Sequence, residues 1–139
     1  MTAFVDTAVL MYAVGGEHPL REPCRRILRR MGDGELDATT SVEVVQEILH
    51  RFLALRRASQ GAEIATDALD LFAPVLPVTH AVMRRMSALV ARYPALTARD
   101  LVHVATCEHE GIRDIISPDR GFDEVSGLRR LDPISAFED

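Results

Sequence analysis

Short runs of hydrophobic residues alternate along the chain with stretches of helical periodicity. Helices are predicted from the spacing of apolar residues at 7–14, 19–31, 41–55, 60–72, 79–93 and 97–110. Buried or edge strands are predicted at 3–5, 36–39, 74–78, 115–117 and 129–131. Strands separated by helices favour a mostly parallel sheet covered on both faces. The pattern therefore predicts an α/β fold, a three-layer α/β/α sandwich, in a single domain over residues 1–139.

Three hydroxyl residues mark the expected starts of helices. Ser41, Thr79 and Thr97 each precede a helical segment and are suited to cap it. Thr97 with Asp100 three positions later resembles a capping box, and Gly111 is placed to end that helix.

The amino-acid composition excludes several classes of protein. The chain is 47% hydrophobic and 27% charged, which is the balance of an ordinary globular protein, and all 16 basic residues are arginine. The absence of lysine excludes Schiff-base chemistry, P-loop nucleotide binding and lysine-dependent phosphotransfer. The net charge of −5 argues against non-specific wrapping of nucleic acid. It leaves room for a nuclease, because metal ions can supply positive charge at the phosphate.

The sequence also predicts a compartment. The first ten residues, MTAFVDTAVL, lack a basic region and carry Asp6, so no signal peptide is expected. The longest uncharged stretch, residues 71–83, covers 13 positions and is too short to span a bilayer. Cys24 and Cys107 are too few for a disulfide framework. A cytoplasmic protein without a membrane segment is the expectation.

Two acidic residues follow predicted strands. Asp6 comes directly after residues 3–5, and Asp119 comes just after residues 115–117. Ligands of open α/β sheets bind outside the carboxyl ends of the strands, where these two side chains are expected. Each also has an ordinary interpretation of about equal weight, Asp6 as a helix N-cap and Asp119 as a turn residue. Asp114 precedes its strand and is excluded.

Two further acidic residues lie on predicted helices. Asp100 occupies the third helical position, where, taken alone, a role at the helix N-terminus is favoured. Glu47 is in mid-helix, where glutamate is usually solvated, and Glu43 lies four residues earlier. At about 100° per residue, Glu47 lies nearer to the boundary of the apolar face than Glu43. Glu47 is therefore the better ligand candidate.

Four carboxylates in one cleft would suit metal-dependent cleavage of a phosphodiester. Mg²⁺ and Mn²⁺ prefer oxygen ligands, and such ions can activate water for displacement at a phosphodiester. The chemistry requires acids from separate elements to converge on one cleft, which sequence spacing alone does not establish.

The same segments resemble a known family. FVDTAVLMYA resembles the first motif of PIN-domain nucleases, and TTSVEVVQEIL resembles the second. LTARDLVHVATCEHEGI, followed by IISPDRGFDEVSGL, resembles the third and fourth. Together the motifs extend from residue 3 to about residue 130. The most similar subgroup is the VapC toxins of bacterial toxin–antitoxin pairs, which are small ribonucleases inhibited by a VapB antitoxin.

The resemblance implies a PIN-like fold and a metal-dependent endoribonuclease that uses Mg²⁺ or Mn²⁺. It implies that the catalytic, metal-binding acids are Asp6, Glu47, Asp100 and Asp119, with Asp123 as a further, weaker ligand. Thr7 and Ser117 would orient these acids through their hydroxyls. The family also implies a homodimer, an RNA substrate and a VapB-type antitoxin whose C-terminal segment lies across the acidic cleft.

Other interpretations fit less well. A haloacid-dehalogenase-type phosphatase needs a second aspartate where position 8 is alanine, and both it and a phospho-receiver domain need lysine. His103, Cys107 and His109 lack the second half of a structural zinc site, and Cys107 suits a small core position. The remaining alternative is an inactive PIN fold that only binds RNA or protein. It predicts the loss of at least one of the four acids, and all four are present.

An arginine-rich helix is the last candidate feature. Arginines recur at four-residue intervals over residues 19–31, including Arg25 and Arg29. The ordinary interpretation is a solvated helix face. The functional one is a rim that contacts RNA phosphates or an acidic partner segment.

Overall fold

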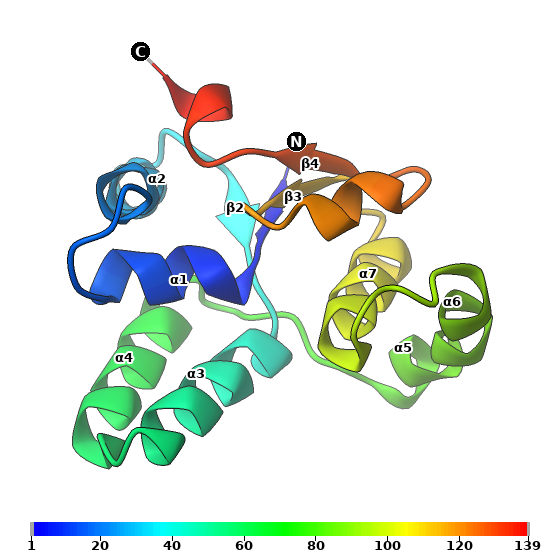
Figure 1. Cartoon of the computed structure of the whole chain (residues 1–139), viewed down its shortest axis with the longest axis horizontal. Coiled ribbons are helices and arrows are strands. Elements are labelled where there is room, and N and C mark those ends of the chain that lie inside the picture. Colours follow the sequence, from blue (N-terminus) through cyan, green and yellow to red (C-terminus); the bar gives the residue numbers. More distant parts are fainter. Residues whose placement is uncertain (1, 139) are drawn as a thin grey trace.

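A four-stranded parallel sheet forms the centre of the molecule. The structure, a computed structural model, describes residues 2–138. The strands are β1 (Ala3–Val5), β2 (Ala38–Thr39), β3 (Asp114–Ile116) and β4 (Arg129–Leu131). They pair in the order β2–β1–β3–β4, and each pairing is parallel (Figure 1). The predicted α/β fold with a parallel sheet is confirmed.

Helices flank this sheet and extend beyond the carboxyl ends of its strands (Figure 1). On one side lie α1 (Thr7–Val14) and α2 (Arg21–Gly32). On the other side lie α5 (His80–Arg84), α6 (Met86–Arg92) and α7 (Ala98–Glu110). Beyond the carboxyl ends, α3 (Val42–Ala54) and α4 (Ala58–Leu71) form a hairpin. Two short 3₁₀ helices, η1 (Arg120–Glu124) and η2 (Ser135–Phe137), lie near β4.

The core lies between the sheet and the helices. Phe4 and Val5 of β1 and Ile115 and Ile116 of β3 are fully buried, as expected for central strands covered on both faces. The helices contribute buried residues that include Val9, Ile27, Ile48 and Val104, and α7 is buried on all sides over residues 101–107. Each such side chain contributes about 1.5–3 kcal/mol of transfer free energy.

The hairpin of α3 and α4 is closely packed at a glycine. A Cβ atom built on Gly61 of α4 would lie 2.5 Å from the Cβ of Phe52 on α3. The two helices can approach this closely because position 61 has no side chain. Packing against α4 therefore holds α3 in place.

The predicted strand at 74–78 is wrong. The segment makes a single bridge between Leu76 and Ser41, in which Leu76 N–H donates to Thr40 O at 2.8 Å and Val42 N–H donates to Leu76 O at 2.9 Å. Pro74, two residues before Leu76, has no N–H to donate toward this partner, and α3 begins directly after Ser41, so the bridge does not extend into a ladder.

The predicted helix over 79–93 is present as two helices, α5 and α6, which meet at Arg85. Thr79 begins α5 as predicted, and its hydroxyl accepts from Val82 N–H at 3.3 Å. At the junction, Arg85 N–H donates to Val82 O at 3.1 Å, a three-residue bond that tightens the turn.

The ends of α7 and the start of α3 are where the sequence predicted them. Thr97 Oγ1 accepts from Asp100 N–H at 3.2 Å, and Gly111 ends α7 with a φ of +71°, which glycine adopts without strain. Ser41 precedes α3, but its buried hydroxyl has no hydrogen-bond partner among residues 2–138.

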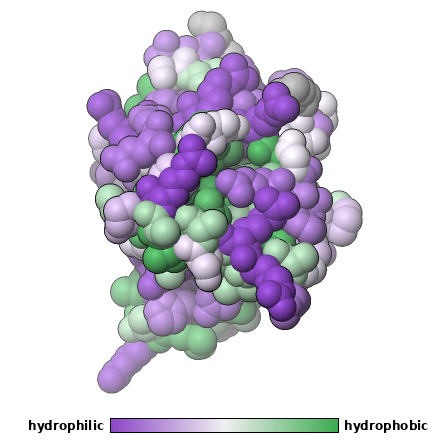
Figure 2. Space-filling view, turned by 90° about the vertical axis from the view of Figure 1, so that its right-hand side faces the viewer, coloured by the Kyte–Doolittle hydropathy of each residue, from purple (hydrophilic) through white to green (hydrophobic). Residues whose placement is uncertain are grey.

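The surface over α5 and α6 carries both hydrophobic and hydrophilic residues. Hydrophobic residues lie between hydrophilic ones on this side of the molecule (Figure 2), and Met83 and Val90 are exposed on these helices. Within residues 2–138, no helix has both the length and the hydrophobicity needed to cross a membrane.

Candidate functional site

Asp6 lies at the carboxyl end of β1 and also begins α1. Its Oδ1 accepts from Thr7 N–H at 2.8 Å, so the carboxylate caps the helix. Its Oδ2 accepts from the hydroxyl of Ser117 at 2.6 Å. The parallel pairing of β1 with β3 makes the second contact possible, because it places residues 6 and 117 side by side. Asp6 therefore serves as a cap while its carboxylate stays fixed at the strand end.

Ser117 connects two of the predicted site residues. Its hydroxyl donates to Asp6 and accepts from Asp119 N–H at 3.0 Å. The Asp119 carboxylate accepts from Gly121 N–H at 2.8 Å, so Asp119 caps η1. One serine side chain thus sets the relative positions of the residues that follow β1 and β3.

Glu47 and His103 meet at the floor of the site. Glu47 on α3 is 9% exposed, and His103 on α7 is 1% exposed. His103 Nε2 lies 2.9 Å from Glu47 Oε1 and 3.7 Å from Asp6 Oδ1. The imidazole is also tilted against the ring of Phe4, at 5.3 Å between centroids. The histidine therefore lies between two of the carboxylates.

His103 was missed as a site residue by the sequence reasoning, which considered it only for zinc. A signal was available, since residues three apart share a helix face and His103 is three positions after Asp100. The other two zinc candidates point elsewhere. Cys107 is buried in the core, where burial raises the pKa of its thiol to about 12, and His109 is exposed in the last turn of α7.

The four predicted acids line one pocket. The pocket has a volume of about 430 Å³, and its lining residues are Asp6, Thr7, Ala8, Met11, Tyr12, Gly15, Glu47, Arg51, Asp100 and Asp119. An adjoining pocket of about 530 Å³ is lined by Glu47, Thr97, Ala98, Arg99, Asp100 and Asp119. The structure thus brings together acids from four separate elements. Asp6 and Glu47 are buried, whereas Asp119 is exposed at the rim.

Burial raises the pKa of the Asp6 carboxyl above its usual range, and the negative charges of Asp100 and Glu47 raise it further. The charge of His103 and the hydrogen bond from Ser117 offset part of this effect. For His103, burial alone would lower the pKa, but the contact with Glu47 and the charge of Asp6 outweigh it, so the pKa is raised. The site therefore holds carboxylates close together, and two of them, Asp6 and Glu47, are buried.

The donor groups of the pocket fit a hard divalent cation. Within residues 2–138 the buried hydroxyl of Thr7 has no hydrogen-bond partner, whereas Oε1 of Glu47 has the imidazole of His103 as its neighbour at 2.9 Å. Both residues line the pocket, and carboxylate and hydroxyl oxygens are the ligands that a hard cation prefers. As placed, no three His, Cys, Asp or Glu side chains within residues 2–138 form a closed ligand cluster. Mg²⁺ needs only one or two direct carboxylates, because it keeps several waters.

Two other acidic residues lie outside the pocket. The Asp123 carboxylate is paired with Arg130, at 2.9 Å to Nε and 3.4 Å to Nη2, and it does not line the pocket. Because Asp123 is paired with Arg130, the geometry does not support the further ligand role that the resemblance implied for it. Glu43 is partly buried on α3 outside the pocket, so Glu47 is the α3 acid that reaches it.

The two arginines singled out on α2 also lie away from the pocket. Arg25 Nε donates to Ala13 O at 2.8 Å and so fastens α2 to α1. Arg29 forms an exposed ion pair with Glu22 at 2.6 Å. Neither residue lines the pocket.

Comparisons with known proteins agree with this geometry. The family model described as PIN domain matches residues 3–128, and the chain belongs to the PIN-domain family. Within that family it is a member of the VapC ribonucleases. It is 36% identical to Ribonuclease VapC13 of Mycobacterium tuberculosis over 128 residues, which cover 91% of this chain and 97% of the relative.

Solved structures show the same fold at lower identity. FitAcB from Neisseria gonorrhoeae matches with a TM-score of 0.75 and 16% identity, over 97% of this chain and 99% of that one. A toxin–antitoxin complex from Klebsiella pneumoniae matches with a TM-score of 0.68 and 17% identity, over 94% of this chain and 97% of that one.

Proposed function

We propose that this protein is a metal-dependent endoribonuclease that cleaves RNA phosphodiester bonds at the pocket of Asp6, Glu47, Asp100 and Asp119. The observation that carries the proposal is the convergence of these acids, from four elements, on one pocket. The relatives named as VapC ribonucleases support RNA as the substrate class. Mg²⁺ or Mn²⁺ is the proposed cofactor.

Each acid has a distinct place in this proposal. Asp6 is the fixed ligand, because Ser117 and Thr7 N–H hold its two oxygens. Asp100 and Asp119 would complete the ligand set from the pocket wall and rim, and Glu47 would contribute its buried carboxylate. A bound Mg²⁺ or Mn²⁺ supplies activation of water and stabilisation of charge on the phosphate oxygens.

Positively charged side chains at the pocket edge suit the same substrate. Arg51 lines the main pocket, and Arg99 lines the adjoining one. Guanidinium groups match the geometry of phosphate oxygens, so the presence of these two residues supports a contact with the RNA backbone next to the acids.

The proposal includes the cellular role of a toxin in a type II toxin–antitoxin pair. A structural neighbour is described as a toxin–antitoxin complex, which supports a VapB-type antitoxin as the partner. We also propose a cytoplasmic homodimer. Inhibition of RNA cleavage by the co-expressed antitoxin tests the first part, and sedimentation at micromolar concentration tests the second.

The experiment that tests the activity is metal-dependent cleavage of RNA by the purified chain. We expect cleavage with Mg²⁺ or Mn²⁺, none after EDTA treatment, and recovery when excess metal is returned. Cleavage that persists in excess EDTA would contradict the metal mechanism. RNA binding without cleavage at any metal concentration would favour the inactive binding module.

A further inference from the structure

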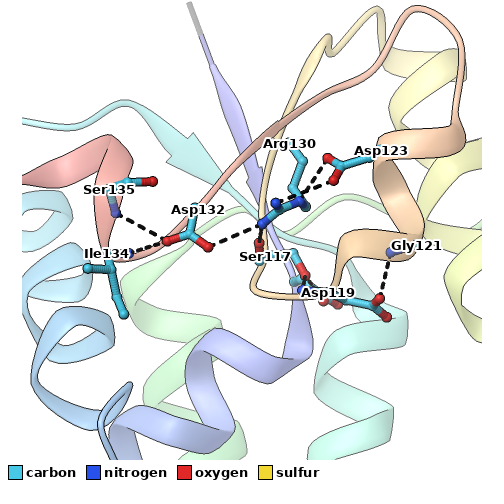
Figure 3. Close-up of polar contacts among 9 residues, drawn as sticks. Ser117, Asp119, Gly121, Asp123, Arg130, Asp132, Ile134 and Ser135 are labelled. Carbon is cyan, nitrogen blue, oxygen red and sulfur yellow. Dashed lines mark hydrogen bonds and ion pairs between the residues drawn. The ribbon is translucent and has the colours of Figure 1, made fainter.

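The turn that carries Ser117 and Asp119 is held from outside the pocket by Arg130 (Figure 3). Arg130 lies on the edge strand β4, yet its side chain is only 11% exposed. Its Nη1 donates to the carbonyl oxygen of Ser117 at 3.0 Å. The hydroxyl of that serine contacts both Asp6 and the backbone of Asp119. Ser117 therefore connects the guanidinium of Arg130 to two of the four pocket acids, Asp6 and Asp119.

The guanidinium is itself fixed by carboxylates on both sides. Asp123 of η1 accepts from Nε at 2.9 Å and from Nη2 at 3.4 Å. Asp132 accepts from Nη1 at 3.3 Å, and its other oxygen accepts from the N–H groups of Ile134 and Ser135 at 2.9 and 3.1 Å (Figure 3). The planar fork of arginine is the side chain that can satisfy these acceptors together. We call this group, Arg130 with Asp123, Asp132 and the Ser117 carbonyl, the Arg130 clamp.

We propose that Arg130 is a positioning residue of the metal site. The Arg130 clamp holds the backbone at Ser117, so the serine hydroxyl stays directed at Asp6 and Asp119 stays at the pocket rim. The proposal rests on the proposed function, because it assigns the clamp a role in metal binding. The positive charge of Arg130 is matched by Asp123 and Asp132, so the clamp acts through geometry rather than by neutralising the pocket.

The neighbouring arginine provides a matched control. Arg129 forms a comparable pair with Asp114, at 2.9 and 3.0 Å, but its side chain is 69% exposed. Asp114 lies at the start of β3, whereas Ser117 follows its end. Loss of Arg129 removes an arginine–aspartate pair from the same strand without touching the turn at 117–119.

The test compares Arg130→Gln with Arg129→Gln in the full chain by two measurements. The first is amide hydrogen exchange in peptides that cover residues 117–122, without metal, which reports local opening of the turn. The second is Mn²⁺ affinity by titration calorimetry. We expect Arg130→Gln to speed exchange in these peptides and to weaken Mn²⁺ binding by about 10-fold, as for other groups that support metal ligands. Arg129→Gln should match the wild type in both.

A second variant separates geometry from charge and covers the case in which Arg130→Gln does not fold. Arg130→Lys keeps the charge, but one ammonium group cannot span the acceptors that the guanidinium contacts. We expect faster exchange in this variant too. Wild-type exchange and Mn²⁺ affinity in Arg130→Lys would overturn the positioning role, as would equal behaviour of Arg130→Gln and Arg129→Gln. A wild-type protein that binds no Mn²⁺ would overturn the proposed metal site, and the exchange measurement alone would then decide whether the clamp holds the turn.

Discussion

Asp6 and Asp114 are equally buried, at 6% exposure each, but lie at opposite ends of the central strands. At the amino end, Asp114 is held by the guanidinium of Arg129 through two hydrogen bonds. At the carboxyl end, Asp6 is held by a serine hydroxyl and a backbone N–H, with the imidazole of His103 at 3.7 Å. One aspartate is neutralised by its partner, whereas the other faces further carboxylates.

The difference shows which of two similar acids is structural and which is suited to chemistry. A buried carboxylate with a bidentate arginine has no unmet need for a cation. The pKa of Asp6 stays raised by burial and by neighbouring acids even with the charge of His103 nearby, so further positive charge would stabilise the ionised carboxylate. A protein retains such an arrangement where function requires it, at some expense in stability.

The largest effect is expected on RNA cleavage, where substitutions of Asp6 and Asp114 should differ. Asp6→Asn should lower RNA cleavage at least about 100-fold, equivalent to about 2.7 kcal/mol, because it removes the fixed charge of the metal site. Asp100→Asn and Asp119→Asn should do the same. Asp114→Asn should leave the cleavage rate unchanged, and an equal loss in Asp114→Asn would show that burial alone, rather than the pocket, sets the effect.

The next comparison is between two glutamates of α3. Glu47→Gln should reduce cleavage by about 100-fold, since it removes the charge of a buried pocket oxygen, whereas Glu43→Gln should have little effect. Steady-state rates of the two variants check this. A greater loss in Glu43→Gln would reverse the assignment of the α3 ligand.

The hydroxyl that joins Asp6 to Asp119 should matter less than the acids. Ser117→Ala removes the contacts that orient both residues and keeps every charge, so we expect a loss of about 10–100-fold in Mn²⁺ affinity or cleavage rate. Calorimetry and kinetics on the same preparation measure both. Wild-type Mn²⁺ affinity would mean that the carboxylates keep their positions without the serine.

The smallest effect is expected on the free energy of unfolding, and it tests whether Asp100 caps α7 or belongs to the metal site. Thr97→Ala should lower the free energy of unfolding by about 1 kcal/mol, because the threonine hydroxyl accepts from Asp100 N–H. Asp100→Asn should leave the metal-free protein as stable or more stable, since its charge faces that of Asp6. Denaturant melts without metal decide between them. Destabilisation of Asp100→Asn similar to that of Thr97→Ala would return Asp100 to the role of a helix-end residue.

The α/β fold and most of its elements could be predicted from the sequence, because hydrophobic periodicity, caps and chain breaks are local signals. Asp6 and Asp119 could be picked out for the same reason, since each directly follows a short buried segment. Glu47 was favoured over Glu43 by its angle to the apolar face, and the structure places it in the pocket. The predicted strand at 74–78 is absent, because Pro74 lacks a donor and the neighbouring chain enters α3 directly after Ser41, neither of which the apolar run reveals.

Contacts between side chains that are distant in the sequence depend on the packing of the folded chain. His103 lies 56 positions from Glu47 and 97 from Asp6 in the sequence, and no local pattern reports contacts between such distant residues. Asp123, expected in the site, is drawn to Arg130 by the pairing of β4 with β3 and by the turn at η1. Contact between distant charges depends on strand register and helix packing, which are global properties of the folded chain. The sequence therefore determined the candidate acids, and packing decided which of them face one another and which are neutralised by arginine.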